Sequence, residues 1–245
     1  MSGVLELEAE LEAELEAELA ARRKQYEHYR DALMRFSKQD DVEYRALGEI
    51  ASTVSGLTGK TKADFVSGSA RYITYSNVFS NPAVAQHETN RVNVRREEKQ
   101  NRLHLGDVLF TASSESLDEV GMSSVVTTDP VEDLYLNSFC FIARFHDPGA
   151  LLPDFTKHLF RGSEMRGQIR KTANGVTRIN ISKARFMKIR VPLPPLELQR
   201  EIVRILDAFT EQEAELEAKL ETELEARRKQ YEYYRDKLLT FEEKR

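Results

Sequence analysis

The same segment occurs twice in this sequence, once near each end. Residues 18–36 read ELAARRKQYEHYRDALMRF and residues 223–241 read ELEARRKQYEYYRDKLLTF, so 14 of 19 positions are identical at an offset of 205 residues. Chance does not produce this agreement, and internal repeats mark units that pack against copies of themselves. We therefore expect the two ends of the chain to form related structures that flank everything between them.

Both copies have the composition and spacing of a long helix. The first follows a run of Leu-Glu-Ala-Glu tetrads, which are strong helix formers, and no Gly or Pro follows Pro195 before the second. At about 1.5 Å per residue, the N-terminal helix would be about 45 Å long and the C-terminal one about 70 Å. Neither fits inside a small globule. Two interpretations remain open, an oligomerisation coiled coil and a spacer that holds two modules apart. Aromatic and leucine spacing predicts a seam that meets another helix, at Tyr26, Tyr29, Leu33, Phe36, Tyr231, Tyr234, Leu238 and Phe241.

The middle of the chain, residues 37–190, differs from both ends. Gly, Asn, Ser and Thr recur at short intervals and separate runs rich in β-branched and aromatic residues. Residues 151–170 are the most probable internal helical segment. We expect three regions: residues 1–36 as a helix, 37–190 as a strand-rich α+β globule, and 191–245 as a proline motif followed by a helix. The runs that favour strands are 71–79, 107–111, 124–127, 139–145 and 186–191.

Charge follows the same boundaries. The chain carries 36 Lys and Arg against 41 Asp and Glu, a net charge of -5, which taken alone argues against a nucleic-acid binder. The two end regions each carry -4, however, and the middle carries +3. Residues 161–190 hold nine cations and one acid, which is typical of a phosphate-binding segment but also of a solvated basic face. Basic and aromatic residues also alternate in 56–77, a second candidate for binding.

No catalytic or metal-binding motif is recognisable. The segment GLTGKT at 56–61 resembles the end of a phosphate loop, but that loop requires glycine where Val54 stands. The five histidines and Cys140 are scattered, whereas zinc needs three or four ligands. A single cysteine, the absence of an 18-residue apolar stretch and a Glu-rich start favour a cytoplasmic protein with no membrane span. We therefore expect no catalysis by this chain and no metal or cofactor bound to it.

Several motifs resemble the specificity (S) subunits of type I restriction-modification enzymes. The segment VPLPPLELQREIVRILDAF at 191–209, followed by the charged helix with RKQYEYYRD, is similar to a conserved region of that family. LGEI (47–50), YITYSNV (72–78), LGDVLFT (105–111) and NGVTRINISKARFMKIRVPLPP (174–195) match the usual order of a target recognition domain. The resemblance implies two recognition domains separated by antiparallel helices, each domain reading half of a bipartite DNA site. It also implies methyltransferase (M) subunits that use S-adenosylmethionine, and in some complexes restriction (R) subunits.

This chain departs from that pattern because it holds one recognition domain, so it resembles a C-terminal half subunit, natural or made by truncation. Two copies that pair their end helices antiparallel about a two-fold axis would restore two recognition domains on one duplex. The target would then be an inverted repeat. A stand-alone coiled-coil protein, either DNA-binding or purely structural, is the alternative. Double-stranded DNA contacts are expected at Lys60, Lys62, Arg71, Tyr75, Asn77, Arg170, Lys171, Asn174, Thr177 and Arg178.

Overall fold

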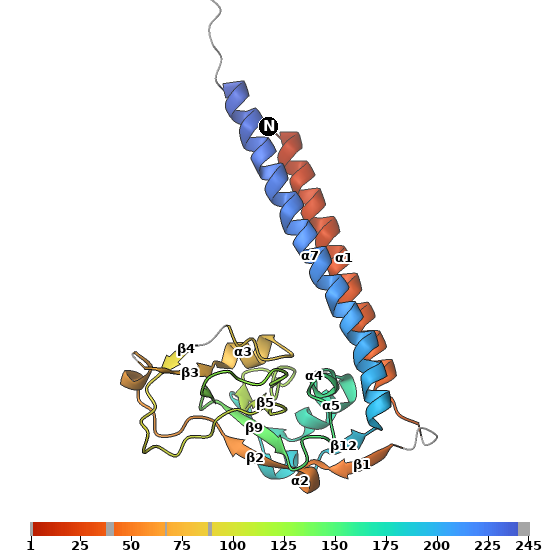
Figure 1. Ribbon diagram of the computed structural model, residues 1–245. Coiled ribbons are helices and arrows are strands. Elements are labelled where there is room, and N and C mark those ends of the chain that lie inside the picture. Colours follow the sequence, from red (N-terminus) through yellow and green to blue (C-terminus); the bar gives the residue numbers. More distant parts are fainter. Residues whose placement is uncertain (1, 38–41, 67, 88–89, 240–245) are drawn as a thin grey trace, which may run out of the picture. The chain divides into compact units, whose positions relative to one another are not determined.

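A computed structural model describes residues 2–37, 42–66, 68–87 and 90–239 of the chain (Figure 1). The chain forms two compact units. A helical unit contains the chain up to Arg30 and from Arg204 onward, and a globular unit contains Asp31–Val203. Among the described residues, no helix combines the length and the apolar character that crossing a membrane requires.

The helical unit pairs α1 (Ser2–Leu33) with α7 (Leu196–Leu239), which lie side by side (Figure 1). Arg23 donates to Glu213 at 2.7 Å and to Glu217 at 2.9 Å. Six residues further along α1, Tyr29 stacks on Phe209 with ring centroids 4.9 Å apart. Contacts that advance along one helix and recede along the other show that the pair is antiparallel. The two predicted long helices are thus confirmed.

The globular unit has the predicted α+β class, with many short strands. Its helices are α2 (Leu47–Ile50), the 3-10 helix η1 (Lys62–Phe65), α3 (Tyr75–Ser80), α4 (Pro153–Leu159), α5 (Ser163–Lys171) and α6 (Lys183–Phe186). Its strands are β1 (Glu43–Ala46), β2 (Ala51–Ser55), β3 (Ala70–Ile73), β4 (Asn90–Val92), β5 (Val108–Thr111), β6 (Ser113–Ser114), β7 (Ser123–Val125), β8 (Leu134–Leu136), β9 (Cys140–Phe145), β10 (Ala173–Asn174), β11 (Ile179–Ile181) and β12 (Arg190–Leu193).

These strands form four small sheets in the described part of the chain. The central sheet has the order β2-β9-β5-β7 and is antiparallel throughout. Strand β3 lies between β4 and β8 and runs parallel to β8. Two further sheets join distant segments, β1 with β12 and β6 with the β10-β11 hairpin.

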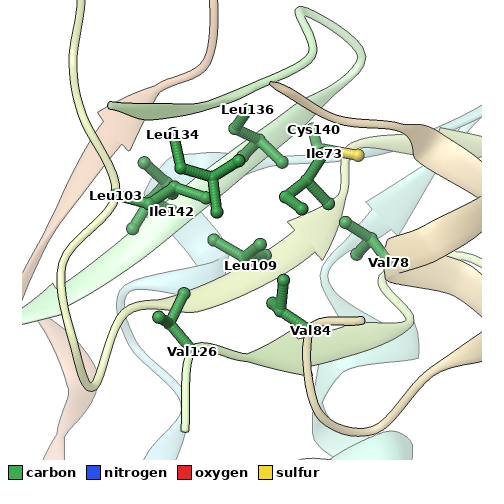
Figure 2. Close-up of a cluster of buried hydrophobic side chains, with 10 residues drawn as sticks. All are labelled: Ile73, Val78, Val84, Leu103, Leu109, Val126, Leu134, Leu136, Cys140 and Ile142. Atoms are coloured by element: carbon green, nitrogen blue, oxygen red, sulfur yellow. The ribbon is translucent and has the colours of Figure 1, made fainter. Parts of the chain in front are cut away.

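Both faces of the central sheet are buried, which explains why β5 and β9 lack alternation of polar and apolar residues. Leu109 pairs with Ile142 in the register, and both lie in an aliphatic cluster (Figure 2). The next pair, Phe110 with Phe141, points to the opposite face. There the rings of Phe110 and Phe186 lie 4.8 Å apart. The aliphatic cluster contains Ile73, Val78, Val84, Leu103, Leu109, Val126, Leu134, Leu136, Cys140 and Ile142.

The structure divides three of the predicted elements. The run 71–79 is a strand only as far as Ile73, because the Thr74 side chain accepts a hydrogen bond from Asn77 N and begins α3. The run 186–191 likewise straddles the end of α6 and the start of β12. The helical segment predicted at 151–170 is present as two helices, because the chain turns at Gly162, the N-cap of α5.

The proline motif ends in a buried glutamine that ties three segments together. Gln199 is fully buried in the first turns of α7. Its Nε2 donates to Ala150 O at 3.0 Å and to Pro194 O at 2.8 Å, while its Oε1 accepts from Leu152 N at 2.8 Å. Because a buried amide requires these partners, the Leu-Pro-Pro-Leu-x-Leu-Gln pattern has a structural function.

Candidate nucleic-acid interface

The β10-β11 hairpin presents three polar residues that were predicted to contact DNA at an exposed turn. Gly175 adopts φ +127°, and a Cβ at this position would overlap Arg178 O, so the turn requires glycine. Asn174, Thr177 and Arg178 are exposed around it. The side chain of Val176, at the tip of the turn, is 96% exposed although it is apolar. The tight turn therefore displays exposed polar side chains, of which Asn174 accepts from Arg185 Nη2 through its Oδ1.

A groove of about 720 Å³ lies beside this hairpin. Its walls come from the start of α3, from β6 and the residues that follow it, from the turn before β9, and from the hairpin itself. The structure thus brings together Tyr75, Thr177 and Arg178, three residues predicted to contact DNA from two distant segments. The lining residues are Tyr75, Ser113, Ser114, Glu115, Glu119, Phe139, Thr177 and Arg178.

Arg178 is held in place on one wall of the groove. Its Nε and Nη2 donate to Ser113 Oγ at 3.2 Å and 3.0 Å. Its guanidinium carbon lies 6.0 Å from the ring centroid of Phe139, a side chain that is 58% exposed. Tyr75 Oη donates to Ser113 O at 3.0 Å and so fixes the same strand. An exposed guanidinium is therefore preorganised by groups from three segments.

Lys60 and Asn77 occupy structural positions and do not face solvent. The Lys60 side chain is 4% exposed, and its Nζ donates to Glu98 and to Asn93 O. Lys60, and after it Arg95, lowers the pKa of Glu98 to about 2 by hydrogen bonding to the carboxylate. Asn77 is buried and bonds both N and O of Ala85. We correct the prediction for these two residues, because a buried side chain that already has partners cannot reach a phosphate.

Two other residues from the first half of the globule, Arg71 and Lys62, were also predicted to contact DNA, and they differ in exposure. Arg71 Nη2 donates to Gln86 O at 2.7 Å, and its side chain is only one-third exposed. Lys62 is exposed at the start of η1. A recess of about 450 Å³ lies next to Lys60 and is lined by the loop 55–60, by Ser138 and by Lys183, whose Nζ sits 5.4 Å from the Phe141 ring centroid.

The basic segment 161–190 is not a uniform cationic face. Arg166 is buried and donates to the carbonyl oxygens of Asp118, Val120 and Gly121, and burial lowers its pKa to about 10. Arg161 similarly binds the carbonyls of Val78, Phe79 and Ser123. Arg170 pairs with Asp118 at 2.6 Å, whereas Lys171 is exposed. Some of the nine cations in this segment therefore stabilise loops inside the globule.

Comparisons with known proteins identify the family to which the chain belongs. The sequence model of the type I restriction modification DNA specificity domain matches residues 39–226. The chain belongs to this family. Because the match covers the whole hairpin, the groove and the first part of α7, these features are parts of a specificity domain.

Relatives of this specificity domain are type I specificity subunits. The EcoR124I/EcoR124II specificity subunit of Escherichia coli is 30% identical over 224 residues, which are 90% of this chain and 53% of that protein. A putative specificity subunit of Haemophilus influenzae is 52% identical over 73 residues, 28% of this chain and 19% of that protein. The chain thus spans about half the length of the first of these relatives.

Solved structures show the same fold as this specificity domain. The HsdS subunit of Thermoanaerobacter tengcongensis superposes with a TM-score of 0.55 at 20% identity, covering 88% of this chain and 53% of that one. An S subunit from M. genitalium superposes with a TM-score of 0.52 at 13% identity, covering 93% of this chain and 57% of that one.

Near the two ends of the chain, the predicted seam residues differ in exposure. Tyr26 is half-buried beside Arg30, and Tyr29 stacks on Phe209. Leu33 and Phe36 are half-buried, as is Tyr231, whereas Tyr234 is 52% exposed. The side chain of Leu238 and all of Phe241 lie outside the described residues.

Sequence reasoning missed Ser113, Phe139 and Lys183 as groups around the two recesses. A signal existed for Phe139, because it follows an Asn-Ser turn and so precedes the buried strand. In the structure Asn137 Oδ1 accepts from Phe139 N at 2.8 Å. In the described residues, no cluster of three or more His, Cys, Asp or Glu side chains is arranged to hold a metal ion.

Proposed function

We propose that this specificity domain reads one half of a bipartite DNA site for a type I restriction-modification system. The observation that carries the proposal is the groove in which Arg178, Thr177 and Tyr75 converge beside an exposed hairpin, within a chain of this family. Exposed cations at Lys62 and Lys171 supply phosphate contacts around it. We expect a chain with this role to act in the cytoplasm.

The chemistry of modification would come from partner subunits. We expect methyltransferase subunits that carry S-adenosylmethionine to dock on the helices, and restriction subunits to join the same complex. The test is co-purification of the full chain with methyltransferase subunits, followed by methylation of a randomised DNA library. Sequence-dependent adenine methylation supports the proposal. Binding to DNA without any methyltransferase association would favour a stand-alone coiled-coil DNA-binding protein.

The repeat suggests how a second copy would pair. At the offset of 205 residues, Arg23 corresponds to Arg228 and Tyr29 to Tyr234. Arg23 and Tyr29 bind Glu213, Glu217 and Phe209 of α7 within the chain. The same surface of α7 therefore suits Arg228 and Tyr234 of a second copy, which are both exposed. In this pairing the second copy's α7 replaces α1, and the two α7 helices run antiparallel about a two-fold axis.

Cysteine cross-linking tests this register directly. Residues 209 and 234 are 25 positions apart on one helix, about 38 Å, whereas a disulfide needs Cα atoms about 4.4–6.8 Å apart. A Phe209→Cys/Tyr234→Cys chain can therefore cross-link only between copies. We expect a covalent dimer on mild oxidation. The matched control is Glu211→Cys/Tyr234→Cys, which faces the other side of the helix. An equal yield from both, or monomer only, would refute the register.

The tetrads would then set the spacing of the two half-sites. Each tetrad adds about 6 Å of helix, close to two base pairs at about 3.4 Å each. Deleting the equivalent tetrads Leu15–Glu18 and Leu220–Glu223 removes corresponding positions from both end helices, so the two helices stay equivalent. We expect the preferred spacer to change while the half-site bases stay the same. If a site-selection experiment returns the original spacer, helix length does not set the spacing of the half-sites.

A further inference from the structure

The groove beside the hairpin combines one guanidinium with two carboxylates. Arg178 lies on one wall, and Glu115 and Glu119 are exposed in the same lining. Glu119 accepts from Ser114 Oγ at 3.2 Å. We propose that Arg178 reads a guanine in the major groove, and that Ser113 and Phe139 are its positioning residues. This inference rests on the proposed DNA-reading function and assigns its base-specific contact.

The hydrogen-bond inventory of Arg178 fits a bidentate contact. A guanidinium has five N–H donors, and Nε and one hydrogen of Nη2 point at Ser113 Oγ. Both hydrogens of Nη1 and one of Nη2 remain for a ligand. Guanine presents O6 and N7 as two adjacent acceptors in the major groove. A bidentate contact from a basic side chain such as arginine to these two atoms is the commonest base-specific contact between proteins and DNA. The N–H groups of Arg178 that Ser113 does not bind are therefore sufficient for this bidentate contact.

The carboxylates favour a base edge over a phosphate as the ligand. Glu115 and Glu119 line the same groove as Arg178 and repel a phosphate placed there, because exposed charges interact over about 10 Å at ordinary ionic strength. Cytosine N4, in contrast, donates to carboxylates. A G·C pair therefore offers acceptors to the arginine and a donor to a glutamate, whereas the DNA backbone offers only negative charge.

The surrounding structure restricts where Arg178 can point. The next residue, Ile179, begins β11 and pairs with Ser114 of β6, and Asn180 pairs with Ser113. The Phe139 ring supports the guanidinium from the other side. Tyr75 Oη donates to Ser113 O and so holds the backbone of the residue whose Oγ orients the arginine. Long cations without such supports, such as Lys171, suit phosphate contacts that carry no sequence information.

The test compares base preference with salt dependence, using the full chain together with methyltransferase subunits. For Arg178→Ala and Arg178→Lys we expect the preference for guanine at one half-site position to fall about 5- to 150-fold, with an unchanged salt slope. Lysine keeps the positive charge but lacks the planar pair of N–H donors that a bidentate contact requires. Lys171→Ala is the matched contrast, because loss of a phosphate contact weakens all sequences equally and lowers the salt slope by about one.

Two positioning variants complete the design. Ser113→Ala and Phe139→Leu should each weaken the guanine preference in part, whereas Phe139→Tyr, which keeps the ring, should retain it. If Arg178→Ala leaves every base preference intact, or lowers the salt slope by one, the guanine contact is refuted while the DNA-reading function stands. If the wild-type chain selects no sequence at all, the proposed function fails and this contact fails with it.

Discussion

The ion pair between Asp107 and Arg144 fixes the turn before β5 and allows a quantitative test of how the globule is held together. The Asp107 side chain is 1% exposed. It accepts from His104 N at 2.8 Å, from Arg144 Nε at 2.8 Å and from Arg144 Nη2 at 2.7 Å. Gly106, at φ +84°, completes the turn.

Replacing Asp107 with Ala leaves a guanidinium and a backbone N–H without their acceptor. Removal of one partner from a buried pair costs about 3–5 kcal/mol. The Arg144 side chain is 28% exposed, so water restores part of its hydration, and we place the loss for Asp107→Ala near the lower end, about 3 kcal/mol. For a unit of this size that corresponds to a fall in Tm of about 6–12 °C.

A double-mutant cycle separates the pair from the general cost of either substitution. Urea unfolding of the full chain, followed by near-ultraviolet circular dichroism of the buried aromatic rings, gives the free energies. We expect Asp107→Ala/Arg144→Met to lose at least about 1 kcal/mol less than the sum of the single variants. Arg170→Ala, which breaks the exposed pair with Asp118, should lose under about 1 kcal/mol. Additive losses, or a loss below about 1 kcal/mol for Asp107→Ala, would refute a stabilising role for the pair.

Three further outcomes follow from buried groups. Phe186→Ala, whose ring lies 4.8 Å from Phe110, should lower the free energy of unfolding by about 3–5 kcal/mol, whereas Phe139→Ala on the surface should lower it by under about 0.5 kcal/mol. Burial raises the pKa of Cys140 from 9.0 to about 12, so the thiol's contribution to stability is full below pH 9 and is lost as the pH rises toward 12. Between pH 8 and pH 10, the urea midpoint of Cys140→Ala should therefore fall less steeply than that of the wild type. The pKa of Glu98 is lowered from 4.5 to about 2, so its contribution is present above pH 4.5 and is lost as the pH falls toward 2. The protection factor of the Asn93 amide, which corrects for the intrinsic pH dependence of exchange, should therefore fall at low pH in the wild type, and Lys60→Met should remove this fall.

The helices were predictable because their signals are local. Helix propensity and the three-to-four spacing act within a few residues, so α1 and α7 follow from the tetrads and the absence of Gly and Pro. The strand run 71–79 was only half right. Thr74 supplies an N-cap, which outweighs the β-propensity of Tyr75 and Val78 once the turn has formed.

The functional assignments of the basic segment could not be read from the sequence, because each arginine is defined by a partner far along the chain. Arg166 binds carbonyls about 45 residues away, and Arg170 binds Asp118. Lys60 and Asn77 similarly acquire partners in Glu98 and Ala85. Charge density along a sequence predicts that a segment is basic, but tertiary contacts decide which cations remain for DNA.

Symmetry would amplify the contact proposed for Arg178. If two copies pair through α7, each half-site presents its guanine to an identical groove, so one substitution alters two positions of the target at once. A bidentate contact discriminates by about 1–3 kcal/mol, and two equivalent contacts would therefore discriminate by about 2–6 kcal/mol between the full site and a site without both guanines. A single unpaired copy would lose only the contribution of one contact. The ratio of affinities for sites that lack one or both guanines thus reports on the pairing of the copies and on the base contact together, because additivity holds only where two separate grooves read the DNA.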